Sequence, residues 1–156
     1  MARIEHFNNP NAPKPSSIVV AVTVFVQDEQ GRVLLIQRTD NGLWALPGGA
    51  QDFGEYIAET AVRETREETG VEIEVTGVVG IYTNPNHVVE YSDGEVRQQF
   101  SICFQGRYVS GEPTTSDESS AVRWVTQDEL DEIPINPSMR LRINHGLERR
   151  SHPYIG

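Results

Sequence analysis

The sequence predicts an α+β or mixed α/β fold, built as a layered sandwich. A continuous β-branched run follows Ser17, as in a strand buried on both faces. Residues 56–69 have helical periodicity and contain neither Pro nor Gly. Further strand-like segments and a second helical segment come after them. This order of strands, helix, strands and helix within 156 residues favours one layered domain.

The N-terminal part of the chain divides into an arm and two strands. Residues 1–16 are rich in Asn and Pro and predict a flexible or loosely docked arm. The run IVVAVTVFV after Ser17 predicts the first strand of the domain. The segment DEQGR has the composition of a turn, and RVLLIQR predicts a second strand. We therefore expect the two strands to form a hairpin.

The first helix is expected between Tyr56 and Thr69, after the glycine-rich turn GLWALPGG. One stripe of its surface is apolar or neutral and is expected to pack against the sheet; it consists of Ile57, Ala58, Ala61, Val62 and Thr65. Gly70 predicts the end of the helix, because glycine adopts the left-handed conformation that terminates many helices.

The second half of the chain predicts further strands and a last helix. VEIEVTGVVGIYT and VRQQFSICFQGRYV are strand candidates on either side of a polar loop, AVRWV is a short strand, and QDELDEI begins a turn of helix. Residues 138–149 have helical spacing, although Gly146 interrupts it. We find no internal repeat and expect a single domain over residues 17–150, followed by a tail at 151–156.

Composition narrows the class of protein. The net charge of −10 argues against a nucleic-acid groove, which needs basic patches. No apolar run is long enough to span a bilayer, and the N-terminus lacks a signal-peptide pattern. Cys103 is the single cysteine, so a disulfide framework is excluded and a buried thiol is expected. These observations favour a cytoplasmic protein with no membrane segment.

Three glutamates of the first helix are the strongest functional signal. Glu64, Glu67 and Glu68 are three and four residues apart, so they share one helix face within an arc of about 100°. Clustered carboxylates repel one another unless a cation lies between them, and hard divalent cations take oxygen ligands. The alternative is a solvated acidic face with ordinary side-chain pairs. The pattern nevertheless indicates a magnesium site on a helix.

The wider spacing supports the metal site. The spacing is Gly, five residues, Glu, seven residues, Arg-Glu, two residues, Glu-Glu, one residue, Gly and an apolar residue. The residues at these positions are Gly49, Glu55, Arg63, Glu64, Glu67, Glu68, Gly70 and Val71. This pattern resembles the signature of the Nudix hydrolases, which are MutT-like enzymes. One position departs from it, because Thr65 stands where the family has an aliphatic residue. The resemblance extends to the LPGG turn and the RWV segment, and it implies a mixed sheet between helices.

The same resemblance implies roles for individual residues. The expected metal ligands are the Gly49 carbonyl and the carboxylates of Glu64, Glu67 and Glu68. Arg63 is expected to anchor a glutamate by a charge-assisted hydrogen bond. A base must take a proton from the attacking water. The candidates are a helix glutamate, Glu67 or Glu64, and Glu118 in the loop before the last strand, with its neighbour Asp117 as competitor.

Candidates for substrate contact are more dispersed. Arg38 ends the second strand, where it can meet a phosphate. The polar loop TNPNHVVEYSDGEVRQQ carries several polar side chains, and loops often provide selectivity; they include Asn84, Asn86, His87, Arg97 and Gln99. Asn136 lies where nucleotide-sanitising relatives in this family read a purine edge. Asn before Pro is also a common turn.

The resemblance implies magnesium-dependent hydrolysis of a nucleoside diphosphate linked to another group, of the ADP-ribose or nucleotide-sugar type, with Mn²⁺ as an alternative metal. Two alternatives stay open: a pyrophosphatase for nucleoside triphosphates, including oxidised ones, and a non-catalytic nucleotide sensor on the same scaffold. The expected partner is a small nucleotide, and a homodimer is compatible with the family. The sequence leaves the natural substrate and the base undecided.

Overall fold

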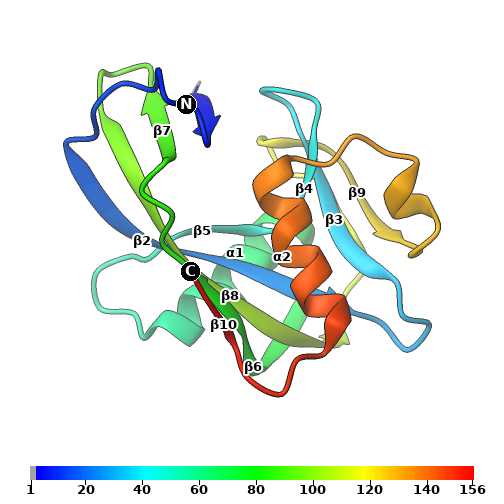
Figure 1. Ribbon diagram of the computed structural model, residues 1–156. Helices are drawn as coiled ribbons and strands as arrows, with labels where there is room; N and C mark the ends of the chain where they lie inside the picture. Colours follow the sequence, from blue (N-terminus) through cyan, green and yellow to red (C-terminus); the bar gives the residue numbers. More distant parts are fainter. Residues whose placement is uncertain (1–2) are drawn as a thin grey trace.

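The computed structural model describes residues 3–156. In this range the chain forms ten strands, two α-helices and one short 3-10 helix (Figure 1). In chain order these are β1 (Arg3–Phe7), β2 (Ser17–Gln27), β3 (Val33–Arg38), β4 (Trp44–Ala45), β5 (Gly48–Ala50), α1 (Ile57–Thr69), β6 (Glu72–Tyr82), β7 (His87–Tyr91), β8 (Val96–Ser110), β9 (Ser119–Val125), η1 (Glu129–Asp131), α2 (Pro137–Glu148) and β10 (Tyr154–Ile155).

The strands form one mixed sheet with β2 and β8 at its centre. These two strands run parallel along the whole of β2, and β8 pairs antiparallel with both β6 and β7. Beyond them, β1 pairs with β7, while β3 pairs antiparallel with β4 and β9. Together with two helices, this mixed sheet confirms the α+β class that the sequence predicts.

The two helices cover opposite faces of the central strands (Figure 1). Ile143 of α2 and Phe25 of β2 belong to one core cluster, whereas Ala61 of α1 packs with Val24 and Val26 in the other. Because successive side chains of a strand point to opposite faces, one strand supplies both cores. This explains the continuous apolar run in β2, although Ile18, near its start, is exposed.

The expected hairpin of β2 and β3 forms only at its turn. The two strands pair at Gln27 and Val33, after which β3 departs to pair with β9 and β4. The edge of β2 left free is occupied by β5, through residues 21–23 opposite 48–50. The glycine-rich turn before α1 therefore adds a strand to the sheet, which local sequence pattern did not indicate.

Three short strands lie where irregular structure was expected. β1 lies within the expected N-terminal arm, β7 within the expected polar loop, and β10 within the expected tail. β1 pairs with β7, and β10 pairs in parallel with β6. Their partners are distant in sequence, and backbone pairing requires no apolar alternation, so the strand signal in these segments was weak.

The glycine that interrupts the last helix permits close packing against β2. A Cβ atom at Gly146 would lie 2.7 Å from the ring of Phe25. In an unpacked helix, Ala is favoured over Gly by about 1 kcal/mol. Here we expect Gly146→Ala to destabilise the fold by about 1–3 kcal/mol, because overpacking outweighs helix propensity. Chemical denaturation measures this difference. Gly77→Ala is the control, because its nearest neighbour is 3.8 Å away; a stabilised Gly146→Ala variant would contradict the packing account.

None of the helices within residues 3–156 has both the length and the apolar character that crossing a bilayer requires.

Candidate active site

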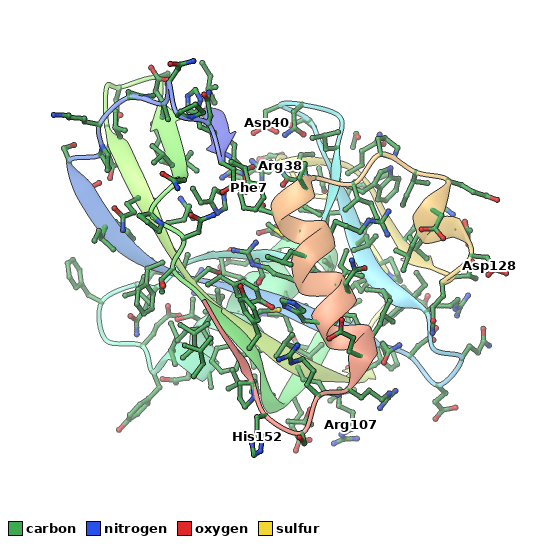
Figure 2. All side chains as sticks on the ribbon, viewed as in Figure 1. Phe7, Arg38, Asp40, Arg107, Asp128 and His152 are labelled. Carbon is green, nitrogen blue, oxygen red and sulfur yellow. The ribbon has the colours of Figure 1, made fainter. Side chains whose placement is uncertain are left out.

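A cavity of about 230 Å³ lies between the central sheet, the ends of β1 and β7, and the first turns of α2. At one end it is lined by Gly48, Gly49 and Glu68, together with Arg38 and Glu118. At the other end the lining comes from β1, β7, β8 and α2. Figure 2 shows Arg38 and Asp40 at the end of β3, on the side that faces Phe7 of β1. Arg3 of β1 contacts Asp40 at 3.6 Å.

Local sequence explains where α1 begins and ends. Tyr56 is the N-cap, and its backbone N–H donates to the Glu59 carboxylate at 2.7 Å. Gly70 ends the helix with φ of 75°, as predicted. Thr65, which departs from the family pattern, is buried, and its hydroxyl donates to the Ala61 carbonyl at 2.8 Å. A polar side chain is therefore accommodated at this apolar position without an unpaired group.

Arg63 is the centre of a charged network on α1. Its Nε donates to Glu55 at 2.6 Å, and a terminal nitrogen donates to Glu64 at 2.9 Å and Glu67 at 3.2 Å. Another donates to the Ala50 carbonyl at 3.1 Å, which ties the helix to β5. Hydrogen bonds from Arg63 are the largest influence on Glu55 and lower its pKa to about 2. Glu55 therefore positions Arg63, and Arg63 positions two of the three predicted ligands. Arg66, by contrast, contacts Glu72 at 3.5 Å.

Glu68 and Glu64 lie in surroundings that disfavour their negative charge. Glu68 is 6% exposed and accepts only a long hydrogen bond, 3.4 Å, from the Gly48 N–H. Burial raises its pKa to about 8, and the charges of Glu64 and Glu118 act in the same direction. Burial also raises the pKa of Glu64. Arg63 acts in the opposite direction, whereas the charges of Glu67 and Glu118 raise the pKa further. Four carboxylates thus repel one another, and two of them, Glu68 and Glu118, line the cavity.

The two glycines of the LPGG turn are close to different groups. A Cβ at Gly48 would overlap the Val22 carbonyl oxygen, whereas a Cβ at Gly49 would overlap the Glu64 carboxyl group. We expect Gly49→Ala to displace Glu64 and lower kcat about 10-fold or more, with little change in thermal stability, since a 1 Å misplacement can cost about 10²-fold. Gly48→Ala should instead destabilise the fold. Steady-state kinetics and thermal melts of both variants test this contrast. Full activity in Gly49→Ala would show that the position of Glu64 is unimportant.

The chemistry of this end of the cavity fits a hard divalent cation. Glu68 is a buried carboxylate with little compensation, and a cation beside it would offset the repulsion among the four acidic groups. Within residues 3–156, however, no three His, Cys, Asp or Glu side chains are gathered as a ready ligand set. Glu67 is turned toward Arg63. A shared cation would require a different side-chain conformation of Glu67.

The remaining predicted site residues separate into two groups. Glu118 lines the cavity, whereas its exposed neighbour Asp117 does not, and Arg38 lines it while bonded to Asp40 at 2.7 Å. Arg97 and Gln99 also line it, with Arg97 bonded to Glu95 and stacked 4.6 Å over the Tyr91 ring.

Two predicted substrate contacts lie outside the cavity lining. The Asn84 side chain donates to Asn8 at 2.8 Å and its oxygen caps a turn at Asn86. Asn136 is buried and is the N-cap of α2, accepting from the Ser138 N–H at 3.0 Å. Its amide donates to Glu5 at 2.6 Å. In this structure Asn136 therefore has the structural role that Asn before Pro often has, and it caps α2.

A buried network at the other end of the cavity was not predicted. Glu5 and His87 both line the cavity, and their side chains are 2.6 Å apart. Glu5 also accepts from the Ser138 hydroxyl at 2.9 Å and from Asn136. His87, one of the candidate substrate contacts of the polar loop, is therefore buried and paired with Glu5. No local signal connects Glu5 to these partners, because more than 80 residues separate them.

This network predicts how stability depends on pH. Burial alone would raise the pKa of Glu5, but its hydrogen bond with His87 and the charges of His87 and Arg3 lower the pKa to about 2. A lowered pKa contributes stability that is present above about 4.5 and is lost as the pH falls toward 2. We expect this loss to amount to about 3 kcal/mol, and to be smaller in Glu5→Gln. Denaturant unfolding between pH 5 and 2 measures it; identical pH profiles for both proteins would contradict it.

Comparisons with known proteins show the family of this chain. The NUDIX domain model matches residues 18–144. The chain belongs to the Nudix family. A MutT-like protein of Streptomyces ambofaciens is 36% identical over 78% of this chain and 72% of its own length. A putative 8-oxo-dGTP diphosphatase of Bacillus subtilis is 32% identical over 78% of the chain and 74% of its own length.

Solved structures show the same fold. A Nudix hydrolase from Nitrosomonas europaea superposes with a TM-score of 0.74 at 22% identity, covering 90% of this chain and 80% of the other. An ADP-ribose pyrophosphatase from Streptococcus suis superposes with a TM-score of 0.67 at 24% identity, covering 90% and 100%. The chain is thus a Nudix hydrolase, a pyrophosphohydrolase that acts on pyrophosphate-containing substrates.

Proposed function

We propose that this Nudix hydrolase cleaves a nucleoside diphosphate linked to another group, of the ADP-ribose or nucleotide-sugar type, with Mg²⁺ as cofactor and Mn²⁺ as a substitute. The observation that carries the proposal is the repulsion among Glu64, Glu67, Glu68 and Glu118 beside a cavity that Glu68 and Glu118 line together with arginines. Such an arrangement accepts cations first and phosphates through them.

The proposed ligands are Glu64, Glu67 and Glu68, with the Gly49 carbonyl. When bound, Mg²⁺ supplies positive charge that polarises phosphoryl oxygens and stabilises the leaving group. Arg63 holds Glu64 by a charge-assisted hydrogen bond, so that this carboxylate is fixed before the substrate arrives, whereas Glu67 would turn from Arg63 toward the cation. Arg38 lines the same cavity and can contact a phosphate there.

A water molecule attacks phosphorus, and a carboxylate must accept its proton. Glu67 is one candidate, since its side chain is exposed and contacts Arg63. Glu118 is the other, because it lines the cavity and belongs to a loop outside α1. Glu64 is the third, but it is closely packed against Gly49. Comparing Glu67→Gln, Glu118→Gln and Glu64→Gln for their effects on kcat at constant metal occupancy would separate these assignments.

Two alternatives are kept. The relative named a putative 8-oxo-dGTP diphosphatase favours a pyrophosphatase for nucleoside triphosphates. A relative from Methanocaldococcus jannaschii is named an ADP-ribose pyrophosphatase, which favours the first proposal. It is 30% identical over 68% of this chain and 61% of its own length. A sensor without turnover is disfavoured by the complete glutamate set. The homodimer and the cytoplasmic location stay predictions.

The test is a screen of nucleoside diphosphate conjugates and triphosphates with Mg²⁺ or Mn²⁺, with products resolved by mass. The proposal predicts a nucleoside monophosphate plus a phosphorylated group. Preference for a triphosphate, with release of pyrophosphate, would replace it by the first alternative. Turnover of none of these compounds with either metal would favour the sensor.

A further inference from the structure

The inner part of the cavity contains polar atoms that the protein leaves without partners. In residues 3–156, four buried side-chain nitrogen or oxygen atoms form no hydrogen bond: Nε of Arg142, the hydroxyls of Thr23 and Ser101, and Nε of Arg3, which lies 3.6 Å from the Asp40 carboxylate. All four residues line this one cavity. Buried polar groups are normally satisfied, and each exception needs an explanation. Their common location indicates that the missing partner is a ligand.

Strand register places three of these residues together. Thr23 of β2 lies opposite Cys103 of β8, and Ser101 is two residues before Cys103, so both hydroxyls belong to the same face of the sheet. Ser101 lies opposite Tyr82 of β6, and the Arg142 guanidinium stacks 4.5 Å over the Tyr82 ring. We call Thr23, Ser101 and Arg142 the inner subsite.

Arg142 has an unusual charge environment for this chain. It is 3% exposed, and it forms no ion pair with any carboxylate in the described part of the chain; one terminal nitrogen donates to the Ser138 carbonyl at 2.7 Å. Burial lowers its pKa, and the charge of Glu5 acts in the opposite direction without forming an ion pair with it. The other three arginines of the cavity differ, since Arg97 pairs with Glu95, and Arg3 and Arg38 both pair with Asp40.

Glu5, an acidic residue of the cavity lining, does not pair with Arg142. Glu5 lies in the same part of the cavity, but its oxygens accept from His87, Asn136 and Ser138. A buried guanidinium with a free N–H, beside two free hydroxyls, matches a group with several negatively charged oxygens. A neutral ligand would leave the charge uncompensated, which is unfavourable in a buried site.

We propose that the inner subsite binds an anionic group, a phosphate or a carboxylate, that the substrate carries in addition to the diphosphate bond that is hydrolysed. This proposal rests on the proposed function for its substrate class. It assigns Arg142, Ser101 and Thr23, which come from α2, β8 and β2, to specificity. Substrates without the extra anion are then bound less tightly than those that carry it.

The first test needs no turnover. Inorganic phosphate is titrated into the metal-free protein, and binding is followed by phosphorus NMR line broadening. We expect Arg142→Met to weaken binding about 10-fold or more, as for a lost charge-assisted hydrogen bond. Arg107→Met is the control, because it removes the same charge from an exposed residue outside this cavity. Absence of phosphate binding, or equal binding by Arg142→Met, would overturn the proposal even if the enzyme is active.

Two smaller changes guard against a folding defect. Ser101→Ala and Thr23→Val remove hydroxyls that form no hydrogen bond within the protein, so thermal stability should stay the same or rise. Phosphate binding should weaken about 2-fold to 10-fold in each. Unchanged binding in both variants would mean that the hydroxyls are ordinary core groups, against the proposal.

The second test identifies the source of the anion. Matched substrates are compared with Mg²⁺: ADP-ribose with its 2′-phosphate, and UDP-glucose with UDP-glucuronate. The wild type should favour the anionic member of one pair in kcat/KM by about 10-fold, and Arg142→Met should lose that preference through KM. A preference that survives in Arg142→Met, or no preference in either pair, contradicts the proposal. Absence of any turnover counts against the proposed function and leaves the phosphate titration as the deciding result.

Discussion

Replacing Glu67 by Gln is expected to lower kcat by about 10³-fold, within the range for loss of a catalytic acid or base, while the protein stays folded. The Glu67 side chain is largely exposed and contacts Arg63 at 3.2 Å, so its charge contributes little to packing. In the proposed mechanism, by contrast, this carboxylate is a metal ligand or the proton acceptor. Steady-state kinetics with saturating Mg²⁺ and a thermal melt measure the two effects separately.

Glu72→Gln is the matched control for this experiment. It removes one negative charge just after the C-terminal end of α1, at an exposed residue that contacts Arg66 and lies outside the cavity lining. We expect it to retain normal activity. If Glu67→Gln were as active as this control, the helix glutamates would be a solvated acidic face after all, and the assignment of the active site would be wrong.

Arg63→Met should reduce both activity and stability. It removes hydrogen bonds to Glu55, Glu64, Glu67 and the Ala50 carbonyl. Hydrogen bonds to charged groups contribute about 1.5–3 kcal/mol, and Arg63 is partly exposed, so we expect a loss of about 2 kcal/mol. This corresponds to a decrease in Tm of about 4–8 °C. Since Glu64 and Glu67 would lose their anchor, kcat should also fall about 10²-fold.

Arg66→Met provides the comparison on the same helix. Its partner Glu72 is 3.5 Å away and both side chains are exposed, so the change in stability should be within about 0.5 kcal/mol. Thermal melts and kinetics of the two variants are measured side by side. Equal effects at Arg63 and Arg66 would mean that the network around Arg63 has no special role in positioning the carboxylates.

The sequence predicted the elements whose signal is local. The boundaries of α1 follow from its apolar stripe and from Gly70, and the central strands follow from runs of β-branched residues. The acidic face was visible for the same reason, because Glu64, Glu67 and Glu68 are neighbours in the chain. The spacing of charged residues and glycines was also sufficient to recognise the family that the comparisons show.

What the sequence could not predict depends on contacts between distant segments. β1 has no strong strand pattern, and it forms because β7, more than 80 residues later, offers a free edge. The pairing of Glu5 with His87 and the isolation of Arg142 follow from that docking and from the position of α2. Asn84 and Asn136 were plausible substrate contacts by composition, but turn and cap hydrogen bonds engage them in this structure.

Turnover in water enriched in oxygen-18, with ADP-ribose, Mg²⁺ and mass analysis of the products, tests most directly whether these carboxylates support attack of water on phosphorus. The account predicts metal-dependent cleavage with one heavy oxygen in a phosphate group of AMP or of ribose phosphate. Cleavage that continues in excess chelator, or heavy oxygen found only on a sugar carbon, would contradict it.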